Sequence, residues 1–464
     1  MLRVVTEVRT LEYNISELLN KGGRIHFVGI GGSGMFPIVQ ILHAQGYEIS
    51  GSDVNEGSII DMERKMGIQV FMGHDAKNVE GASMLVVTAA LFSDNPEVLR
   101  ANELGIPVIA RADMFGYITR LYKDSLCISG THGKTTTTCL LTSIMIKAGK
   151  DPSALIGGKL PLIHGYGLVG NSDHFVCEAC EFKDTFLHLS PAYSIILNID
   201  DDHLDYFGTL ENAKLSFLKF ANNASHSVVA NIDDANTVSA LSTCKTPVIY
   251  FGESDQADYR ISNIELYDKA FYQFSITHNG DQLGTFKLSI PGKHNVWNAA
   301  AAIVTAFEVG CDSSLIQEGI SSFTGAGRRF EFLGTFDGVT VADDYAHHPT
   351  EIAATLDAAQ NMGYNRVIAV FQPFTYSRTY LLMDEFVEAL KKADILVMTE
   401  IMGSREKNTY NVYTADLAAK IPGSVWFNTF DEVVDHVKSI AKEGDLVITL
   451  GCGDIYKAAH MMLQ

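Results

Sequence analysis

The sequence predicts a three-domain α/β protein. Its 464 residues, 47% of them apolar, are enough for about three hydrophobic cores of ordinary size. Apolar runs of strand length alternate with helical stretches along the chain, which is typical of parallel sheets covered by helices. Two of these runs end in glycine-rich loops that lead into helices. We expect the domains to cover residues 1–122, 123–324 and 325–464.

The first domain is expected to be Rossmann-like. Its strand candidates are 24–30, 48–51 and 84–88, and it closes near 107–122. The first strand leads into Gly29-Ile30-Gly31-Gly32-Ser33-Gly34, whose glycines permit close approach of a diphosphate to a helix N-terminus. Asp53 follows the next strand, where an acidic side chain can meet a ribose hydroxyl. Taken alone, this pattern fits a nicotinamide dinucleotide site, and it also fits a tight strand-to-helix turn.

The central domain carries a loop typical of a P-loop ATPase with a parallel sheet. The run 126–129 continues directly into Gly130-Thr131-His132-Gly133-Lys134-Thr135-Thr136, two residues shorter than the usual phosphate-binding loop. Gly130 and Gly133 let backbone N–H groups face one anion, Lys134 adds a positive charge, and Thr135 offers a hydroxyl to Mg²⁺. An oxidoreductase has little need of such a loop, so its presence favours ATP. The alternative is a glycine turn that only caps a helix.

Two further polar groups are expected beside this loop. The strand candidates here are 175–177, 193–199 and 228–231. Glu178 ends one strand, and His203 follows the acidic turn Asp200-Asp201-Asp202 after another, so both can hold magnesium with Thr135. The alternative for the acidic turn is a solvated surface loop.

An alanine-rich helix over 299–304 is expected next, preceded by His294, Asn295 and Asn298. These side chains can cap the helix, and asparagine also pairs well with an adenine edge. The two roles can coexist.

The third domain is expected to be Rossmann-like, with strands at 340–342, 367–371, 395–399 and 446–450. Arg329 and Asp344 lie near its start. An arginine from a neighbouring domain can stabilise charge on a transferring phosphoryl group. The alternative for Arg328 and Arg329 is a hinge face that pairs with solvent or carboxylates.

Composition narrows the class of protein. The chain has 35 Lys and Arg against 55 Asp and Glu, a formal charge of −20, so a nucleic acid partner is not expected. Residues 1–23 lack a signal-peptide pattern and no apolar run is long enough to span a bilayer, so we expect a cytoplasmic protein without membrane insertion. The seven scattered cysteines fit reduced thiols. Cys177 and Cys180 are interpreted as buried strand residues, the alternative being a zinc or redox pair.

Over nearly its whole length the chain resembles the ATP-dependent Mur ligases of peptidoglycan synthesis, and within them the alanine-adding branch. The motifs that carry the resemblance are separated but ordered. They are Gly29 to Met35, Gly73-His74, Gly130 to Thr136, Glu178 to Glu181, Asn198 to Asp205, Gly292 to Asn298, Gly327 to Phe330, Asp343 to Glu351 and Gln372-Pro373.

The resemblance implies roles for individual residues. It implies that ATP contacts residues 130–136 with His294, Asn295 and Asn298, that Mg²⁺ is held by Thr135, Glu178 and His203, and that Lys134, Glu178, His203, Arg329 and Asp344 are catalytic. For the substrates, UDP-N-acetylmuramate and L-alanine, it implies contacts with Gly29, Gly31, Gly32, Ser33, Gly34, Asp53, His74, Arg111, His348 and Arg378. Asp344 is similar to the family aspartate that engages ATP.

The chain also departs from the family pattern. Many relatives have histidine where this chain has Phe374 after Gln372-Pro373, which removes a polar group near the expected amino-acid site and bears on selection of L-alanine over glycine or L-serine. Arg378 still matches an arginine suited to a carboxylate. Sister ligases carry a carbamylated lysine where a gapless alignment places Phe217, with Lys214 and Lys219 nearby, and its absence agrees with the alanine-adding branch.

The expected reaction joins L-alanine to the lactyl carboxylate of UDP-N-acetylmuramate through an acyl phosphate formed from ATP. Three alternatives remain open at this point. They are a recycling ligase that attaches a preformed peptide to the same UDP sugar, a nicotinamide oxidoreductase, and a nucleotide-controlled binding module.

Overall fold

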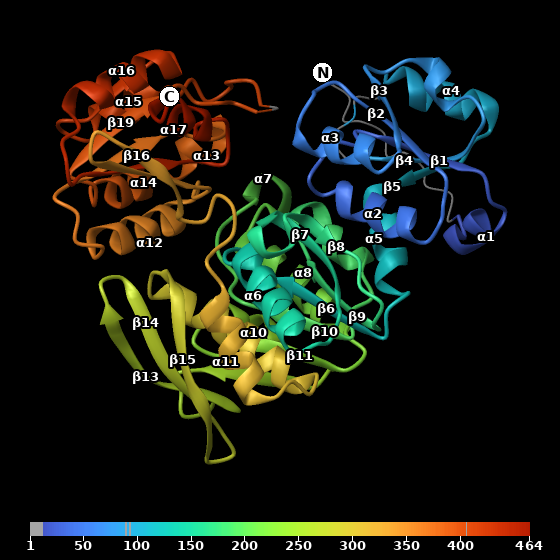
Figure 1. Cartoon of the computed structure of the whole chain (residues 1–464), viewed down its shortest axis with the longest axis horizontal. Helices are drawn as coiled ribbons and strands as arrows, with labels where there is room; N and C mark the ends of the chain where they lie inside the picture. The colour runs from blue at the N-terminus through green and yellow to red at the C-terminus, as the bar shows by residue number, and fades with distance from the viewer. Residues whose placement is uncertain (1–12, 89–90, 92–93, 405) are drawn as a thin grey trace.

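The protein is described here by a computed structural model that covers residues 13–88, 91, 94–404 and 406–464. Three sheets, of five, ten and six strands, follow one another along the chain. Figure 1 shows them as three bodies, with the blue N-terminal and red C-terminal parts lying above the green and yellow central part. None of the helices formed by the described residues is long and apolar enough to cross a membrane.

The N-terminal sheet has the order β3-β2-β1-β4-β5 and all its neighbours are parallel. Because β2 and β4 flank β1, the loop after β1 lies where the strand order reverses, the usual ligand position in such sheets. This confirms the Rossmann-like expectation. The strands are β1 (Arg24–Val28), β2 (Ile49–Asp53), β3 (Gln69–Met72), β4 (Ala82–Val87) and β5 (Val108–Ala110), and the helices are α1 (Ile15–Asn20), α2 (Phe36–Ala44), α3 (Ser58–Lys65), η1 (Ala76–Val79), α4 (Pro96–Leu104) and α5 (Arg111–Thr119).

The central sheet has the same arrangement around β6. This strand lies between β9 and β10, so the loop after it also lies where the strand order reverses. The parallel strands are β6 (Asp124–Ser129), β7 (Ser153–Leu160), β9 (His174–Glu178), β10 (Tyr193–Ile196), β11 (Ser227–Asn231) and β12 (Val248–Gly252). The helices are α6 (Lys134–Lys147), η2 (Pro161–Ile163), η3 (Phe182–His188), α7 (Leu204–Phe207), α8 (Leu210–Asn222), α9 (Ala235–Leu241), α10 (His294–Glu308) and α11 (Ser313–Ser322). The expected strand 193–199 is shorter, since β10 ends at Ile196 and Asn198 beyond it bonds Thr131 of the loop after β6.

The central sheet is not parallel throughout, which the sequence analysis did not predict. β13 (Tyr259–Asp268), β14 (Phe271–His278) and β15 (Asp281–Pro291) form an antiparallel meander beside β12, and β8 (Gly165–Leu168) pairs antiparallel with β7. The turn between β14 and β15 contains Asn279 and Gly280, both with positive φ, as two-residue hairpin turns require. The meander forms the yellow lower left of Figure 1.

The C-terminal sheet has the order β16-β17-β21-β18-β19-β20, parallel except for the β16–β17 hairpin. Its strands are β16 (Glu331–Phe336), β17 (Val339–Asp344), β18 (Val367–Phe371), β19 (Ile395–Thr399), β20 (Val425–Phe427) and β21 (Leu446–Leu450), and its helices are α12 (Pro349–Gln360), α13 (Tyr376–Leu381), α14 (Met383–Leu390), α15 (Thr414–Ala419), α16 (Phe430–Ile440) and α17 (Tyr456–Met462). All four expected strands are present.

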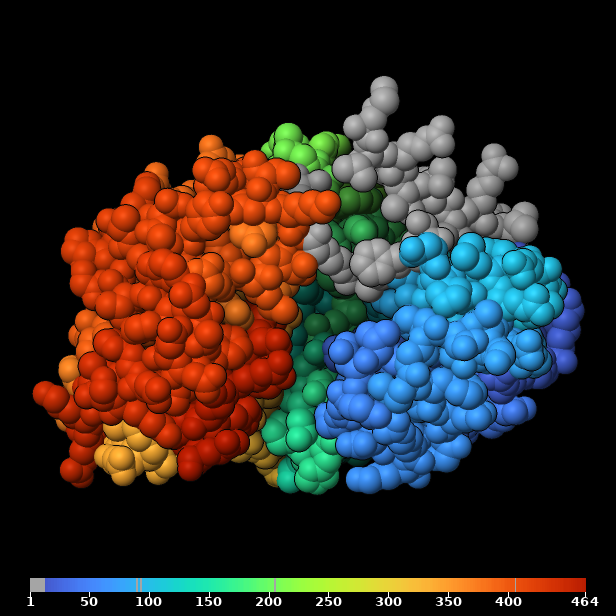
Figure 2. Space-filling view, turned by 90° about the horizontal axis from the view of Figure 1, so that it is seen from above, coloured from blue at the N-terminus to red at the C-terminus, as the bar shows by residue number. Residues whose placement is uncertain are grey.

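Apolar packing fixes the domains around the central sheet. One buried cluster joins the N-terminal and central parts, with Phe115 packed edge-to-face on Phe175 at a centroid distance of 6.3 Å. A second covers the other face of the central sheet beneath α6, α10 and α11. Figure 2 shows the two outer bodies flanking a hollow whose floor is the green central part.

Candidate functional site

The loop between β6 and α6 forms a cradle of backbone N–H groups. Gly130 has φ of +142° and Gly133 has φ of +85°, conformations that favour glycine. A Cβ atom on Gly133 would lie 2.2 Å from Asn298 Oδ1, so the close approach of α10 also requires glycine here. Because neither glycine carries a Cβ, the N-terminus of α6 can approach an anion closely at this loop.

Asn198 holds this loop from the end of β10. Its Oδ1 accepts from His132 N at 2.8 Å, its Nδ2 donates to His132 O at 3.1 Å, and its backbone O accepts from Thr131 N at 3.0 Å. Asp200 N donates to Thr131 Oγ1 at 2.9 Å. The sequence analysis gave Asn198 no role, and the signal that could have found it is an asparagine directly after a strand beside the loop.

Lys134 lies within the cradle. Its Nζ donates to Gly130 O and to Thr131 O, and it pairs with Glu181 Oε2 at 3.0 Å. Burial opposes the charged amine, but Glu181 and neighbouring acidic groups outweigh it and raise the pKa of Lys134 above its usual value. Lys134 is therefore a permanent cation at this loop. Glu181, buried at 3% exposure, is a partner that the sequence analysis did not single out.

Glu178 and Thr135 lie on either side of the gap between β9 and α6. Glu178 Oε1 accepts from Gly157 N at 2.6 Å, and Arg329 Nη2 lies 3.4 Å from Thr135 Oγ1. Burial raises the pKa of Glu178, partly offset by the Gly157 N–H and by Arg329. The structure thus gathers a carboxylate, a hydroxyl and a guanidinium from two domains beside the cradle.

His203 lies near the same charges. It has φ of +53°, its Nε2 is 3.8 Å from Asp202 Oδ2, and its ring lies 4.6 Å from that of Phe182. Burial lowers its pKa, Asp202 and Glu181 oppose the shift, and Lys134 reinforces it. The side chain is therefore a neutral imidazole at neutral pH, which keeps a lone pair available.

A cavity of about 440 Å³ opens beside the cradle, between the central and C-terminal domains. Its lining combines apolar walls with amides, charged groups and the loop itself. Its lining includes Phe251, Ile290, Pro291, Trp297 and Phe323, with Asn231, Asn236, His294, Asn295 and Asn298, and Arg329, Asp344 and Glu351. Size and lining fit a nucleoside whose phosphates reach the cradle.

The expectation that His294, Asn295 and Asn298 precede a helix is wrong in position, since α10 begins at His294. They lie in its first two turns instead of capping it, and no side chain caps this helix. Asn295 Nδ2 donates to Pro291 O at 2.7 Å, and Asn298 Nδ2 donates to Asn295 Oδ1 at 2.9 Å. Burial lowers the pKa of His294 to about 4, so it is neutral.

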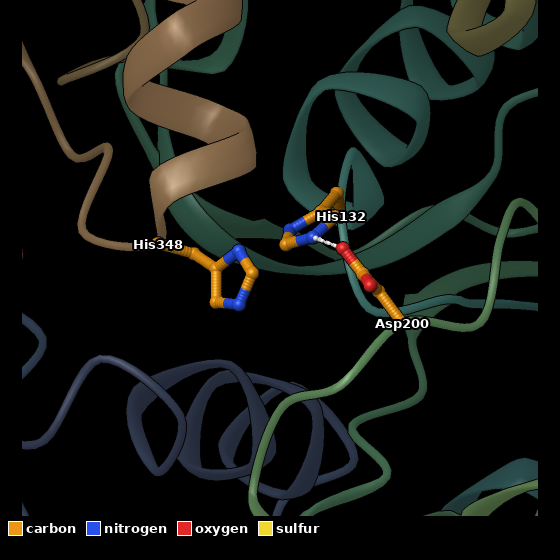
Figure 3. Close-up of side chains that lie close together, drawn as sticks. All are labelled: His132, Asp200 and His348. Atoms are coloured by element: carbon orange, nitrogen blue, oxygen red, sulfur yellow. Dashed lines mark hydrogen bonds and ion pairs between the residues drawn. The ribbon is translucent and has the colours of Figure 1, made fainter. Parts of the chain in front are cut away.

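His132 connects the cradle to the C-terminal domain. Its Nε2 lies 3.0 Å from Asp200 Oδ2 and its Nδ1 lies 3.2 Å from Glu351 Oε1 (Figure 3 shows the Asp200 side). Burial favours the neutral ring, but the two carboxylates outweigh it and raise the pKa of His132 to about 9. Glu351, which the sequence analysis quoted without a role, also bonds His347 N at 3.1 Å. The pairing fastens α12 to the loop.

Arg329 and Asp344 both reach the cavity from the C-terminal domain. Arg329 lies over the ring of Tyr345 at 4.8 Å. Asp344 accepts from Phe330 N and Ala346 N, each at 2.7 Å, and burial raises its pKa to about 6. Arg328 points elsewhere, to Asp343 at 2.8 Å, which fits the carboxylate-paired alternative for that residue.

Arg378 is held at the interface between the same two domains. Its Nη2 donates to Asp202 Oδ1 at 2.6 Å, and the pair is largely buried. His347 lies close by, with its ring 6.5 Å from that of Phe374. His348 precedes α12 and is 5% exposed. The structure therefore places Arg378 at the interface of the central and C-terminal domains, beside the acidic turn after β10.

The N-terminal loop faces β7 and β9 of the central domain across a second cavity of about 160 Å³, lined by Ser33, Gly34 and Arg111 on one side and by Gly157 and Glu178 on the other. Arg111 Nη1 lies 3.4 Å from Gly34 O.

Of two other expected substrate residues, Asp53 bonds this loop and His74 bonds elsewhere in the domain. Asp53 Oδ2 accepts from Gly31 N at 3.0 Å. His74 Nδ1 lies 2.8 Å from Glu97 Oε2, beneath the sheet's carboxyl edge. Gly29 has φ of +80° and its Cβ position is 2.9 Å from Thr88, so glycine is required there.

Two expectations concern residues near the site. Cys177 is buried in β9 with its Sγ 3.4 Å from Cys127 Sγ, as expected, but Cys180 is exposed beyond the strand, so that half of the expectation is wrong.

At the position where sister ligases carry a carbamylated lysine, Phe217 is buried in α8 and packs edge-to-face on Phe186, with the ring centroids 5.2 Å apart. Lys214 pairs with Glu211 at 2.9 Å.

Comparisons with known proteins agree with this geometry. Family models described as Mur ligase family, catalytic domain, Mur ligase middle domain, and Mur ligase, glutamate ligase domain match residues 24–123, 128–306 and 328–453. The chain is 43% identical over 452 residues to a UDP-N-acetylmuramate--L-alanine ligase of Caldanaerobacter subterraneus, covering 96% of this chain and 98% of the relative. It is 41% identical to the enzyme of that name from Acetivibrio thermocellus, covering 96% of each chain.

Solved structures show the same likeness. The crystal structure of UDP-N-acetylmuramate-alanine ligase from Thermotoga maritima is similar with a TM-score of 0.81 and 29% identity, covering 95% of this chain and 98% of that one. A murein peptide ligase from Psychrobacter arcticus shares the fold, with a TM-score of 0.74, 24% identity, and coverage of 95% and 98%.

Proposed function

Because the chain belongs to the Mur ligase family, we propose that it joins L-alanine to the lactyl carboxylate of UDP-N-acetylmuramate at the expense of ATP, in the cytoplasmic synthesis of peptidoglycan precursors. The observation that carries the proposal is that the phosphate loop lines one cavity and Glu178 lines another. The larger cavity is shared with the C-terminal domain and the smaller one with the N-terminal domain. We therefore assign the nucleotide to the larger cavity and the UDP sugar to the smaller one.

The reaction follows from this arrangement. The lactyl carboxylate oxygen attacks the γ-phosphorus of ATP, the bond to the β-phosphate oxygen breaks, and ADP leaves. The amine of L-alanine then attacks the acyl carbon, loses a proton, and expels inorganic phosphate as the amide forms. A carboxylate is a poor electrophile at neutral pH, so activation is required, and the protein contributes mainly position and charge.

We assign the charge stabilisation to Lys134 and Arg329. Lys134 is cationic under all physiological conditions and lies within the loop. Arg329 reaches Thr135 from the C-terminal domain, so its contribution depends on the two domains staying together. An arginine delivered in this way stabilises the equatorial phosphoryl oxygens.

We assign Mg²⁺ to Thr135, Glu178 and His203. A hydroxyl and a carboxylate are hard oxygen donors of the kind that Mg²⁺ prefers, and the neutral imidazole of His203 keeps a free lone pair, so the donor set fits. The ion, when bound, supplies screening between the attacking carboxylate and the phosphates. Glu178 also faces the smaller cavity, where we assign the lactyl end of the UDP sugar next to Arg111.

We assign the carboxylate of L-alanine to Arg378. Asp202 holds this guanidinium at 2.6 Å through one Nη2 atom. A two-pronged hydrogen bond from the guanidinium to the substrate carboxylate would set the direction of the amine. Phe374 and His347 lie together next to this position, so the wall at this point is aromatic.

The experiment that tests the function measures phosphate release with ATP, Mg²⁺, UDP-N-acetylmuramate and L-alanine, and then omits each in turn, with mass detection of the product. We expect release only when both acceptor substrates are present, with a product heavier by one alanyl residue. A preformed peptide that outcompetes L-alanine would identify a recycling ligase instead. ATP binding without an amide product would identify a binding module.

A further inference from the structure

A cluster of metal-binding side chains lies at the junction of the nucleotide loop and the C-terminal domain, apart from the residues to which Mg²⁺ is assigned. His132 comes from the loop, Asp200 from the segment after β10, and His348 from the position before α12. One ligand atom of each lies within 4.8 Å of the others. Figure 3 shows the three side chains converging on one space.

We propose that His132, Asp200 and His348 bind a divalent transition-metal ion of the Zn²⁺ class, which fastens the C-terminal domain to the nucleotide loop. Two imidazoles and one carboxylate are the donor set of Zn²⁺, Co²⁺ and Ni²⁺ sites, whereas Mg²⁺ favours oxygen donors. Three protein ligands also leave a fourth position for water.

His132 is already oriented as a metal ligand. Its Nε2 is 3.0 Å from Asp200 Oδ2, while Glu351 Oε1 lies 3.2 Å from its Nδ1. A carboxylate on the far nitrogen of a histidine fixes the ring and directs the other nitrogen at the ion, as is usual in metal sites. Thr350 Oγ1 donates to Asp200 Oδ2 at 3.1 Å and steadies the carboxylate in the same way.

His348 supplies an independent indication. The residue is 95% buried, since its exposure is 5%, and its Nε2 has no hydrogen-bond partner among the described residues. Its ring faces that of His132 with the centroids 5.0 Å apart. Its Nδ1 accepts from Thr350 N at 3.4 Å, which places the proton of the neutral ring on Nε2. A buried imidazole with an unmet polar atom costs free energy, and coordination through Nε2 would move that proton to Nδ1 in exchange for the long contact with Thr350 N.

The position of the site determines what the ion does. His132 and Asp200 also line the larger cavity, and His348 belongs to the other domain. The ion replaces the proton between His132 Nε2 and Asp200 Oδ2, which is released to solvent, and links the two domains through coordinate bonds.

The test is a titration of the full chain with Co²⁺, in the absence of nucleotide, in which binding is monitored by visible absorption. We expect one saturable site with the intense d–d bands of a four-coordinate ion, displaced by Zn²⁺ and not by millimolar Mg²⁺. His348→Gln and Asp200→Asn should each weaken binding at least tenfold, and Glu351→Gln by about 10- to 100-fold through loss of orientation. Circular dichroism of each variant checks that it is folded.

His203→Ala and Cys180→Ser are the matched controls, because they remove other accessible metal-binding side chains and should leave the titration unchanged. The proposal is overturned if folded His348→Gln and Asp200→Asn both bind Co²⁺ like the wild type, if the spectrum shows thiolate charge transfer, or if the wild type shows no saturable binding. The proposed ligase function is tested separately, by phosphate release and the mass of the product, and Mg²⁺ is assigned to a different set of donors, Thr135, Glu178 and His203.

Discussion

Replacing Lys134 with alanine should affect stability and catalysis through separate causes. The side chains of Lys134 and Glu181 are 17% and 4% exposed and lie 3.0 Å apart. Removing one partner of a buried pair leaves the other charge unpaired, which costs about 3–5 kcal/mol in the free energy of unfolding. Loss of the cation from the phosphate cradle should in addition raise the activation barrier by about 3 kcal/mol, or about 150-fold in kcat.

A second substitution separates the two effects. Glu181→Gln removes the unpaired charge, so the double variant should recover most of the free energy of unfolding, measured in urea, while kcat from phosphate release stays low. The matched control is Glu181→Gln alone, which should keep kcat within a few-fold of the wild type. Near-normal turnover by Lys134→Ala, or recovery of kcat in the double variant, would refute the role given to Lys134.

Three further predictions concern the loop and the domain junction. Gly133→Ala places a Cβ 2.2 Å from Asn298 Oδ1 at positive φ, so ATP affinity by calorimetry should fall at least tenfold, and adding Asn298→Ala should restore part of it. Because the pKa of His132 is raised from 6.5 to about 9, its stabilisation is complete below pH 6.5 and is lost as pH rises through 9. Urea unfolding from pH 6 to 10 should show this loss, and His132→Asn should abolish it. Arg378→Lys should raise KM for L-alanine at least tenfold, with KM for ATP nearly unchanged, since lysine cannot form the two-pronged bond. An equal rise in both constants would count against that assignment.

The central parallel strands of each sheet were predictable because buried parallel strands form continuous apolar runs, whereas partly exposed ones such as β3 and β20 were not predicted. Runs such as 367–371 and 446–450 are fully buried. The antiparallel meander of β13 to β15 was not predicted, because buried residues in a strand such as Tyr259–Asp268 alternate with exposed ones and form no continuous apolar run. Asn279-Gly280 was nevertheless a readable signal for a hairpin.

The site was predictable where chemistry depends on a local pattern. Gly130 to Thr135 form one turn, so their sequence alone indicates a phosphate loop. The partners Asn198, Glu181 and Glu351 were not assigned, because their roles depend on contacts across 66, 47 and 219 residues. The start of α10 was misplaced because His294, Asn295 and Asn298 were interpreted as preceding the helix, whereas the helical backbone already begins at His294.

The measurement that tests the proposed reaction most directly traces the oxygen atoms of the lactyl carboxylate by isotope labelling. UDP-N-acetylmuramate labelled with ¹⁸O in its lactyl carboxylate is supplied with unlabelled ATP and L-alanine, and the inorganic phosphate is analysed by mass. If the carboxylate attacks phosphorus, one labelled oxygen must leave with each phosphate released, in step with each amide formed. Phosphate without label, accompanied by the alanyl product, would contradict the acyl-phosphate route.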